Sequence, residues 1–208
     1  MSKNMRIFFM KKDRAKYISH LDLQRTMQRA LKRAKLPVWE TEGFNPHIYL
    51  TFALPLSLGI ESVSESFDVK LIADISPQEI CTKLGASLSQ DLQVIKAAEP
   101  IHKPVEIQKA RYEILLSDSE KFNEYLEQDE IIITKKTKKG QAQLDIKPLI
   151  ELEELEKNKI ILRLPAGSGV NLNPLQVLSG FEAFTGAELQ TCSIIRTGIF
   201  CANGEIFT

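Results

Sequence analysis

Five cations in one short segment have the spacing of a charged helix face: Arg25, Arg29, Lys32, Arg33 and Lys35. Arg25, Arg29 and Arg33 are four residues apart, so on a helix they form a row along one face. Like charges at this spacing repel one another by a few tenths of a kcal/mol per pair, and a purely structural helix more often alternates their sign. Several cations on one face can neutralise several phosphates together. The pattern favours a phosphate-contacting surface, and the alternative is a solvated helix face.

Two of the three histidines flank this basic segment: His20 precedes it and His47 follows it. An imidazole suits proton transfer near neutral pH, and cleavage of RNA by its 2′-hydroxyl needs only an acid and a base. In such a reaction Tyr17 and the arginines would stabilise the charged transition state. The alternative, which we favour, is that the histidines cap, bind phosphate or pack. The sequence therefore leaves the question of an enzyme open and favours a binding role.

The segment around His47 combines turn-forming residues with an aromatic residue. Gly43 permits unusual dihedrals, and Asn45 followed by Pro46 favours a turn. Phe44, or Tyr49 after the turn, can stack on a nucleic-acid base if it is exposed, while core packing is the alternative for either ring. The predicted nucleic-acid-binding residues are therefore Arg25, Arg29, Lys32, Arg33, Lys35, Phe44, Asn45 and His47.

A helix from about residue 19 to residue 35 would position the cations. Ser19 is a suitable N-cap, and Asp22 fills the acidic position of a start that resembles a capping box. Pro37 ends the segment, because proline cannot continue the hydrogen-bond ladder. An apolar stripe with spacings of three and four predicts the buried face, and its members are Leu23, Met27, Ala30, Leu31 and Ala34.

Short apolar or alternating segments on both sides of the basic helix predict strands. A second helix begins at Ser76-Pro77, with serine at the N-cap and proline at the first position. We interpret the order as β-α-β-β-α-β, the ferredoxin-like pattern. The predicted strands of this half are 5–10, 48–52, 66–72 and 92–98, with a further short strand at 38–41.

A similar order follows the proline-flanked linker 100–104, so we predict domains at 1–100 and 106–208. The acidic run 151–156 is interpreted as a solvated loop or short helix. The fold class expected is α+β, with two tandem ferredoxin-like halves whose antiparallel sheets carry helices on one face. The predicted strands of the second half are 111–116, 130–136, 143–150, 159–164 and 193–200, and its predicted helices are 119–128 and 173–184. Asn173-Pro174 opens the second of these helices, and Gly186 ends it.

The charge is distributed unevenly along the chain, although the formal net charge is zero. Residues 1–35 carry eleven Lys and Arg against two Asp and Glu, whereas residues 106–208 carry twelve against sixteen. A protein that touches nucleic acid at one end is expected to show such an asymmetry.

Three widely spaced cysteines, Cys81, Cys192 and Cys201, predict a reducing, cytoplasmic environment. The sequence contains no Cys-x-x-Cys pair, so we expect neither a metal site nor a cofactor. No apolar run approaches 18 residues and the start is short and polar, so we expect no membrane span and no signal peptide.

Two smaller motifs have a binding interpretation beside a plain structural one. Gly167-Ser168-Gly169 could cradle a phosphate but lacks the P-loop lysine pattern, so a plain turn is favoured. Four lysines around a predicted hairpin tip could hold backbone phosphates, although a charged tip more often serves solubility; they are Lys135, Lys136, Lys138 and Lys139.

The motifs Y-I-S-H-L-D-L, G-F-N-P-H and F-A-L-P-L-x-L-G together resemble the bacterial radical SAM-linked family, a domain of unknown function. The resemblance covers the first 100 residues well and the second half more loosely, through L-D-I-K-P-L-I. It implies a companion of a radical S-adenosylmethionine protein and brings no known catalytic residues. The order of elements is also similar to that of the repeat-associated RNA-binding proteins of CRISPR systems, at the level of fold.

Three hypotheses follow for the function. The first is a non-catalytic module that presents an RNA, such as tRNA or rRNA, to a radical SAM partner; the cluster cysteines would belong to that partner. The second is a metal-independent endoribonuclease that uses His20 or His47. The third is a protein-interaction subunit that binds no nucleic acid, in which the basic helix docks on an acidic surface.

Overall fold

The computed structural model describes residues 2–137, 140–186 and 188–208, without the side chains of residues 135–137, 141 and 192. The chain forms two compact units. The first contains the residues up to Glu106 together with Ile206–Thr208, and the second contains Ile107–Glu205. The last three residues therefore belong with the first unit, which the sequence did not indicate. Both units combine helices with antiparallel strands, so the α+β class is as predicted.

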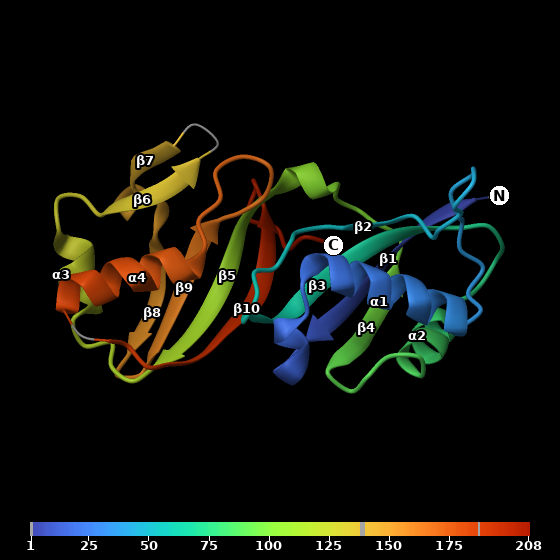
Figure 1. Ribbon diagram of the computed structural model, residues 1–208, viewed down its shortest axis with the longest axis horizontal. Coiled ribbons are helices and arrows are strands. Elements are labelled where there is room, and N and C mark those ends of the chain that lie inside the picture. The colour runs from blue at the N-terminus through green and yellow to red at the C-terminus, as the bar shows by residue number, and fades with distance from the viewer. Residues whose placement is uncertain (1, 138–139, 187) are drawn as a thin grey trace. The chain divides into compact units, whose positions relative to one another are not determined.

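The first unit has a four-stranded antiparallel sheet in the order β4-β1-β3-β2 (Figure 1). Along the chain its strands and helices alternate as β-α-β-β-α-β, which is the predicted order. Its elements are β1 (Lys3–Lys11), the 3₁₀ turn η1 (Asp13–Tyr17), α1 (His20–Arg33), β2 (Leu50–Phe52), β3 (Glu61–Leu71), α2 (Pro77–Gly85), β4 (Leu92–Ala98) and the 3₁₀ turn η2 (Pro104–Glu106).

The core of the first unit lies between this sheet and its two helices. Alternate residues of β1, namely Met5, Ile7 and Phe9, point into it because successive side chains of a strand face opposite sides. Both helices contribute to the same cluster, through Met27 of α1 and Ile80 of α2 among others. The apolar stripe predicted for the basic helix is buried as expected, which leaves its charged side to solvent.

The second unit has its own antiparallel sheet in the order β10-β5-β9-β8, and β6 and β7 pair as a separate hairpin. Figure 1 shows α3 and α4 in this unit. Its elements are β5 (Ile107–Leu116), α3 (Phe122–Glu127), β6 (Ile132–Thr137), β7 (Gly140–Asp145), the 3₁₀ turn η3 (Lys147–Leu149), β8 (Glu151–Glu156), β9 (Lys159–Pro165), α4 (Pro174–Thr185) and β10 (Thr191–Cys201).

The acidic run 151–156 corrects a prediction, because it is strand β8 and neither a loop nor a helix. Its glutamates are neutralised by cations on its partner strand β9 and on β5, the strand beyond β9. Glu153 accepts from Arg111 at 2.6 Å and from Arg163 at 2.5 Å. Glu154 and Glu156 both contact Lys159, at 2.7 and 2.6 Å. Opposite charges on adjacent strands stabilise the pairing, which the local composition could not reveal.

Two other strand predictions are wrong in extent. Residues 38–41 form only isolated bridges, Val38 with Leu71 and Glu40 with Ile48. The strand expected at 143–150 ends at Asp145, because the Asp145 carboxylate accepts the backbone N–H of Ile131 at 2.9 Å and of Lys147 at 3.0 Å. A side chain that bonds its own backbone two residues on forms a turn, so the strand cannot continue.

The segment around Gly167 has a structural explanation for its glycine. Gly167 has a φ of +113°, and a Cβ at this position would lie 2.2 Å from the backbone oxygen of Ile107. Such a close approach of two backbones excludes every residue with a side chain. Helix α4 then starts with the Asn173 capping box and ends at Gly186, as the sequence predicted. The turn interpretation of the Gly167 motif therefore accounts for this glycine without a ligand.

Candidate nucleic-acid-binding surface

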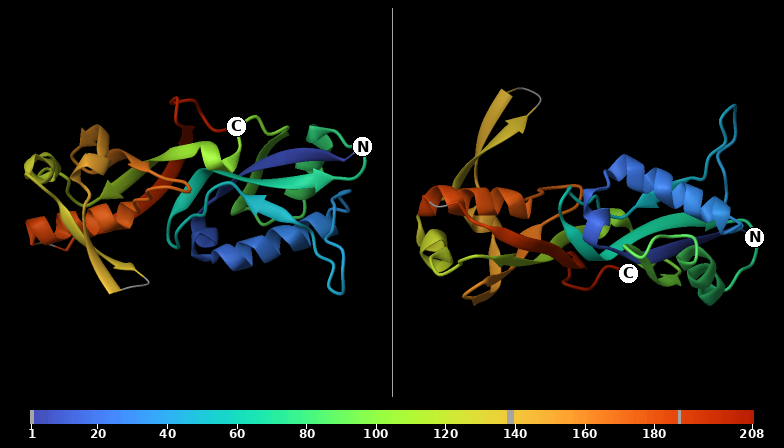
Figure 2. Two further views of the ribbon diagram at one scale, coloured as in Figure 1. Left: turned by 90° about the horizontal axis from the view of Figure 1, so that it is seen from above. Right: turned by 60° about the horizontal axis from the view of Figure 1, so that its bottom comes forward.

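Helix α1 packs against the sheet of its own unit (Figure 2). Four predicted cations lie on its exposed side and Lys35 follows its C-terminal end. Ser19 caps the helix, and its hydroxyl oxygen accepts the backbone N–H of Asp22 at 3.1 Å. At the other end Lys35 adopts a left-handed φ of 50°, and the N–H of Leu36 bonds the carbonyl of Leu31 at 3.3 Å. This closure resembles a Schellman motif and places Lys35 at the negative end of the helix dipole.

All five cations are exposed; three of them have a side-chain hydrogen bond or ion pair and two have none among the described residues. Arg25 contacts Asp22 at 3.2 Å, Lys32 contacts Glu40 at 3.3 Å, and Arg33 donates to the backbone oxygen of Ser87 at 2.7 Å. The side chains of Arg29 and Lys35 make no hydrogen bond or ion pair with any residue that the structure describes. We name these five residues the α1 cation row.

The two ion pairs of the α1 cation row are weak competitors for a phosphate. The side chains of Arg25 and Asp22 are 62% and 60% exposed, and pairs this exposed contribute about 0–1 kcal/mol. The hydroxyl of Ser19 donates to Asp22 at 2.7 Å and lowers the pKa of Asp22, and Arg25 lowers it further. Asp22 is therefore ionised at neutral pH, and the cations without a neighbouring acid on the helix, Arg29, Lys32 and Arg33, lie in the C-terminal part of α1.

The segment after α1 is a structured loop that rests against this helix. The Thr41 N–H donates to the His47 carbonyl at 2.8 Å, and the His47 N–H donates to the Thr41 hydroxyl at 3.2 Å. The side-chain amide of Gln28 donates to the Ile48 carbonyl at 2.8 Å. We name residues 41–48 the Phe44 loop; Figure 2 shows the chain after α1 projecting from its unit.

The sequence-predicted residues of the loop have different roles in it. The side chain of Phe44 is fully exposed. The Nδ1 atom of His47 lies 3.0 Å from the Thr41 hydroxyl and 3.1 Å from the Asn45 carbonyl, so this ring holds the loop in shape. Neither Gln28 nor Thr41 was predicted, because the contact of Gln28 with Ile48 joins distant residues and that of Thr41 with His47 depends on how the loop closes.

The structure does not bring His20 and His47 together as an acid–base pair. His20 lies at the start of α1 and its ring packs against Phe52, with the centroids 5.1 Å apart. Gln28, which holds the Phe44 loop, lies eight residues further along α1, or about 12 Å at 1.5 Å per residue. Tyr17 is exposed beside Lys16, whose ammonium group lies 5.5 Å from the ring centroid. A proton-transfer mechanism would therefore have to pair either histidine with a group other than the second one.

The structure also bears on metal sites and membrane spans. Among the described residues, no group of three His, Cys, Asp or Glu side chains is placed to hold a metal ion. No helix in the described part of the chain is both long and apolar enough to cross a membrane.

The predicted phosphate contacts of the lysine-rich hairpin fall outside what the structure describes. Lys138 and Lys139 lie outside the described residues, as do the side chains of Lys135 and Lys136.

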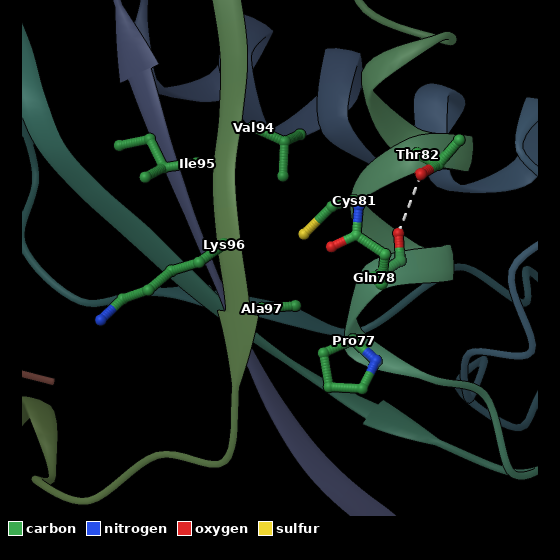
Figure 3. Close-up of a pocket in the computed structure, with 8 residues that line it drawn as sticks. All are labelled: Pro77, Gln78, Cys81, Thr82, Val94, Ile95, Lys96 and Ala97. Carbon is green, nitrogen blue, oxygen red and sulfur yellow. Dashed lines mark hydrogen bonds between the residues drawn. The ribbon is translucent and has the colours of Figure 1, made fainter.

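A groove of about 350 Å³ lies between α2 and β4 and contains a cysteine (Figure 3). Pro77, Gln78, Cys81 and Thr82 line it from α2, and residues 94–97 line it from β4. The sulfur of Cys81 points toward β4 (Figure 3), and burial raises the pKa of its thiol. A neutral thiol is a poor nucleophile and a poor metal ligand, so this groove lacks an activated group.

Cys81 is accordingly expected to react slowly with iodoacetamide in the folded protein. Only the thiolate is alkylated, so a raised pKa shifts the pH dependence of the reaction. The pH at which alkylation reaches half its maximal rate should be higher in the folded protein than in the protein unfolded in urea. Peptide mass spectrometry after timed alkylation at several pH values measures this for Cys81 separately from the other cysteines. An equal pH profile in the folded and unfolded chains would contradict the effect of burial.

The chain belongs to a family described as uncharacterized proteins conserved in bacteria (DUF2344), whose model matches residues 4–174. This description contains no radical SAM link, which stays a prediction from the resemblance. A search of curated proteins found no match. Among solved structures, a chain titled as part of the crystal structure of a Cbf5-Nop10-Gar1 complex aligns with a TM-score of 0.46 and 13% identity. The alignment covers 94% of this chain and 48% of that one, so this chain spans about half the length of the solved chain.

Proposed function

We propose that the chain binds RNA, such as tRNA or rRNA, through the α1 cation row and the Phe44 loop, as a non-catalytic module that presents a substrate for modification or processing. The main support is the exposure of all five predicted cations, four on one surface helix whose apolar side is buried and Lys35 just after its C-terminal end. Arg29 and Lys35 are without an ion pair among the described residues, so a phosphate would replace only water there. Guanidinium and ammonium groups on one face match the regular charge of a nucleic-acid backbone.

The partner that we propose is a radical SAM enzyme in the cytoplasm. The resemblance of the three motifs supports this role, and the sequence itself has no closely spaced cysteines that could hold an iron–sulfur cluster. In this proposal the cluster chemistry belongs to the partner, and the present chain supplies affinity for the RNA. A module that only binds needs no acid–base pair, which agrees with the separation of His20 from His47.

We also propose that both units are variants of the ferredoxin-like fold. The strand order β4-β1-β3-β2 of the first unit follows that pattern when its strands are numbered along the chain. The order β10-β5-β9-β8 of the second unit is equivalent if the hairpin β6–β7 is treated as an insertion after α3. Such sheets are frequent supports for binding surfaces but do not define a function by themselves.

Filter binding of a labelled RNA oligonucleotide at several salt concentrations tests the proposed function. If the α1 cation row contacts phosphates, log K falls linearly with log salt, with a slope of about −0.7 per phosphate contacted on a single strand. Five contacts would give a slope of about −3.5. Absence of binding at low salt, or affinity that does not depend on salt, would show that the proposal is wrong.

A protein-interaction role is the second candidate, because three large apolar side chains are exposed near the start of α1. They are Tyr17, Leu21 and Leu58, and the Gly59 N–H donates to the Lys16 carbonyl at 3.0 Å, which brings Leu58 next to Tyr17. This role predicts a stoichiometric partner that survives nuclease treatment and is lost on Leu21→Ser with Leu58→Ser. Retention of that partner by the double variant would exclude this surface.

A further inference from the structure

The Phe44 side chain is presented to solvent at the tip of a loop that is held in place. Its relative exposure is 106%, so the ring has no covering neighbour in the part of the chain that the structure describes. Neighbouring Gly43 has a φ of +121°, a conformation that turns the chain at this point and that other residues rarely adopt. Burying this ring against a ligand would remove its apolar surface from water, which is favourable for binding.

The loop is closed by its own hydrogen bonds and is tied to α1. Thr41 and His47 close it through three contacts, at 2.8, 3.0 and 3.2 Å. Gln28 and Lys32 of α1 hold its base through Ile48 and Glu40. A ring on a pre-organised support binds more tightly than the same ring on a mobile segment, because less conformational freedom is lost.

The charges around Phe44 indicate which part of a nucleotide it would meet. Glu42 lies two residues before it and is exposed, so a phosphate at the loop tip would be repelled. The cations instead lie along α1, beside the base of the loop. A backbone that follows α1 would therefore place its phosphates on the helix and a base at the tip.

The other exposed aromatic of this segment is already engaged. Tyr49 packs edge to face with Trp39, with the ring centroids 6.2 Å apart, and Lys70 lies 5.8 Å from the Trp39 ring centroid. Of the two rings that the sequence suggested for stacking, Tyr49 has a ring contact and Phe44 has none among the described residues. Every base has a π-face, but a base inside a duplex is stacked on its neighbours and cannot offer it.

We propose that Phe44 stacks on an unpaired base, so that the RNA bound here is single-stranded or looped at this position. This inference rests on the proposed function and narrows its substrate class. A ligand recognised only as a double helix would contact the α1 cation row and leave Phe44 without a role.

The test compares a single-stranded RNA with a blunt duplex of the same sequence. Stacking on one base corresponds to about a 5- to 150-fold loss of affinity on alanine substitution. Phe44→Ala is expected to show this loss for the single strand and no loss for the duplex, while the salt slope stays unchanged. The matched control is Ile101→Ala, which removes an apolar side chain that is also strongly exposed but lies in the linker.

A fluorescence measurement checks the contact itself. Trp39 is the single tryptophan of the chain, so Phe44→Trp in a Trp39→Phe background places the only indole at the loop tip. Its emission is expected to be quenched by the single strand and not by the duplex. Salt-dependent binding with no effect of Phe44→Ala on the single strand would overturn this inference and leave the proposed function intact. Salt-independent binding, or none, by the unmodified protein would overturn both.

Discussion

Replacing Asp68 with alanine is expected to destabilise the first unit by about 3 kcal/mol. Asp68 forms a bidentate pair with Arg6, whose Nε and terminal nitrogen lie 2.7 Å from its two oxygens. The Arg6 side chain has no exposed surface, so loss of its partner leaves an uncompensated buried cation, which costs about 3–5 kcal/mol. We expect the lower end of this range, because the Asp68 side chain is 25% exposed.

The same arginine holds the last residues of the chain, so the variant should release them first. Arg6 donates to the backbone oxygens of His102 at 2.9 Å and of Thr208 at 3.0 Å, and its guanidinium lies 4.2 Å from the Phe207 ring centroid. Hydrogen exchange should show faster exchange at residues 206–208 before the rest of the unit. The backbone N–H groups of Ile101 and His102 also donate to the Thr208 carbonyl, at 3.1 and 2.8 Å, so Arg6 shares the attachment of this end with the linker.

Urea unfolding of three variants shows whether the loss of stability comes from an unpaired buried charge on Arg6 or only from a lost contact. Arg6→Met combined with Asp68→Leu should lose less stability than Asp68→Ala alone, because the double variant leaves no buried charge. Asp68→Asn should lie between them, because it keeps one acceptor. A loss below 1 kcal/mol for Asp68→Ala would mean that the pair contributes little to the fold.

Removing Arg25, Arg29 and Arg33 together is expected to weaken RNA binding on the order of 100-fold at 50 mM salt. Three lost phosphate contacts reduce the salt slope by about 2 on a single strand. Between 50 mM and 1 M salt, that difference in slope corresponds to a factor of a few hundred. The apolar side of α1 is untouched, so the thermal stability of the Arg25→Ala, Arg29→Ala, Arg33→Ala variant should be close to that of the unmodified protein.

A second triple variant controls for net charge. Lys103→Ala, Lys121→Ala and Lys157→Ala removes the same number of exposed cations from positions outside α1. Filter binding with this variant should show a loss of less than threefold, since none of these lysines belongs to the α1 cation row. Equal losses for the two triple variants would mean that binding responds to overall charge rather than to this surface.

Local signals predicted the elements that depend on local chemistry. Ser19 as a cap, the stripe from Leu23 to Ala34 and the stop before Pro37 define α1 from the sequence, and Asn173 with Gly186 does the same for α4. These signals act within one or two turns of a helix. The same stripe implied that the arginines would be exposed, so the orientation of the candidate surface could also be predicted.

The features that the sequence could not predict depend on contacts between residues that are distant in sequence. The glutamates of β8 form a strand because Arg111, Lys159 and Arg163 neutralise them, and no local pattern contains that information. The contact of Gln28 with Ile48, which positions the Phe44 loop, has the same character. The bonding of Arg33 to the Ser87 carbonyl is a third example, since it joins α1 to the end of a separate helix.

The most direct test of the account is to map where a bound RNA touches the chain. A single-stranded RNA that contains 4-thiouridine would be crosslinked to the protein by ultraviolet light, and the linked peptides identified by mass spectrometry. We predict crosslinks within residues 25–47, with the strongest at Phe44 and its neighbours. Crosslinks confined to Ile107–Glu205, with residues 25–47 unmodified, would contradict the assignment of the α1 cation row as the RNA-binding surface.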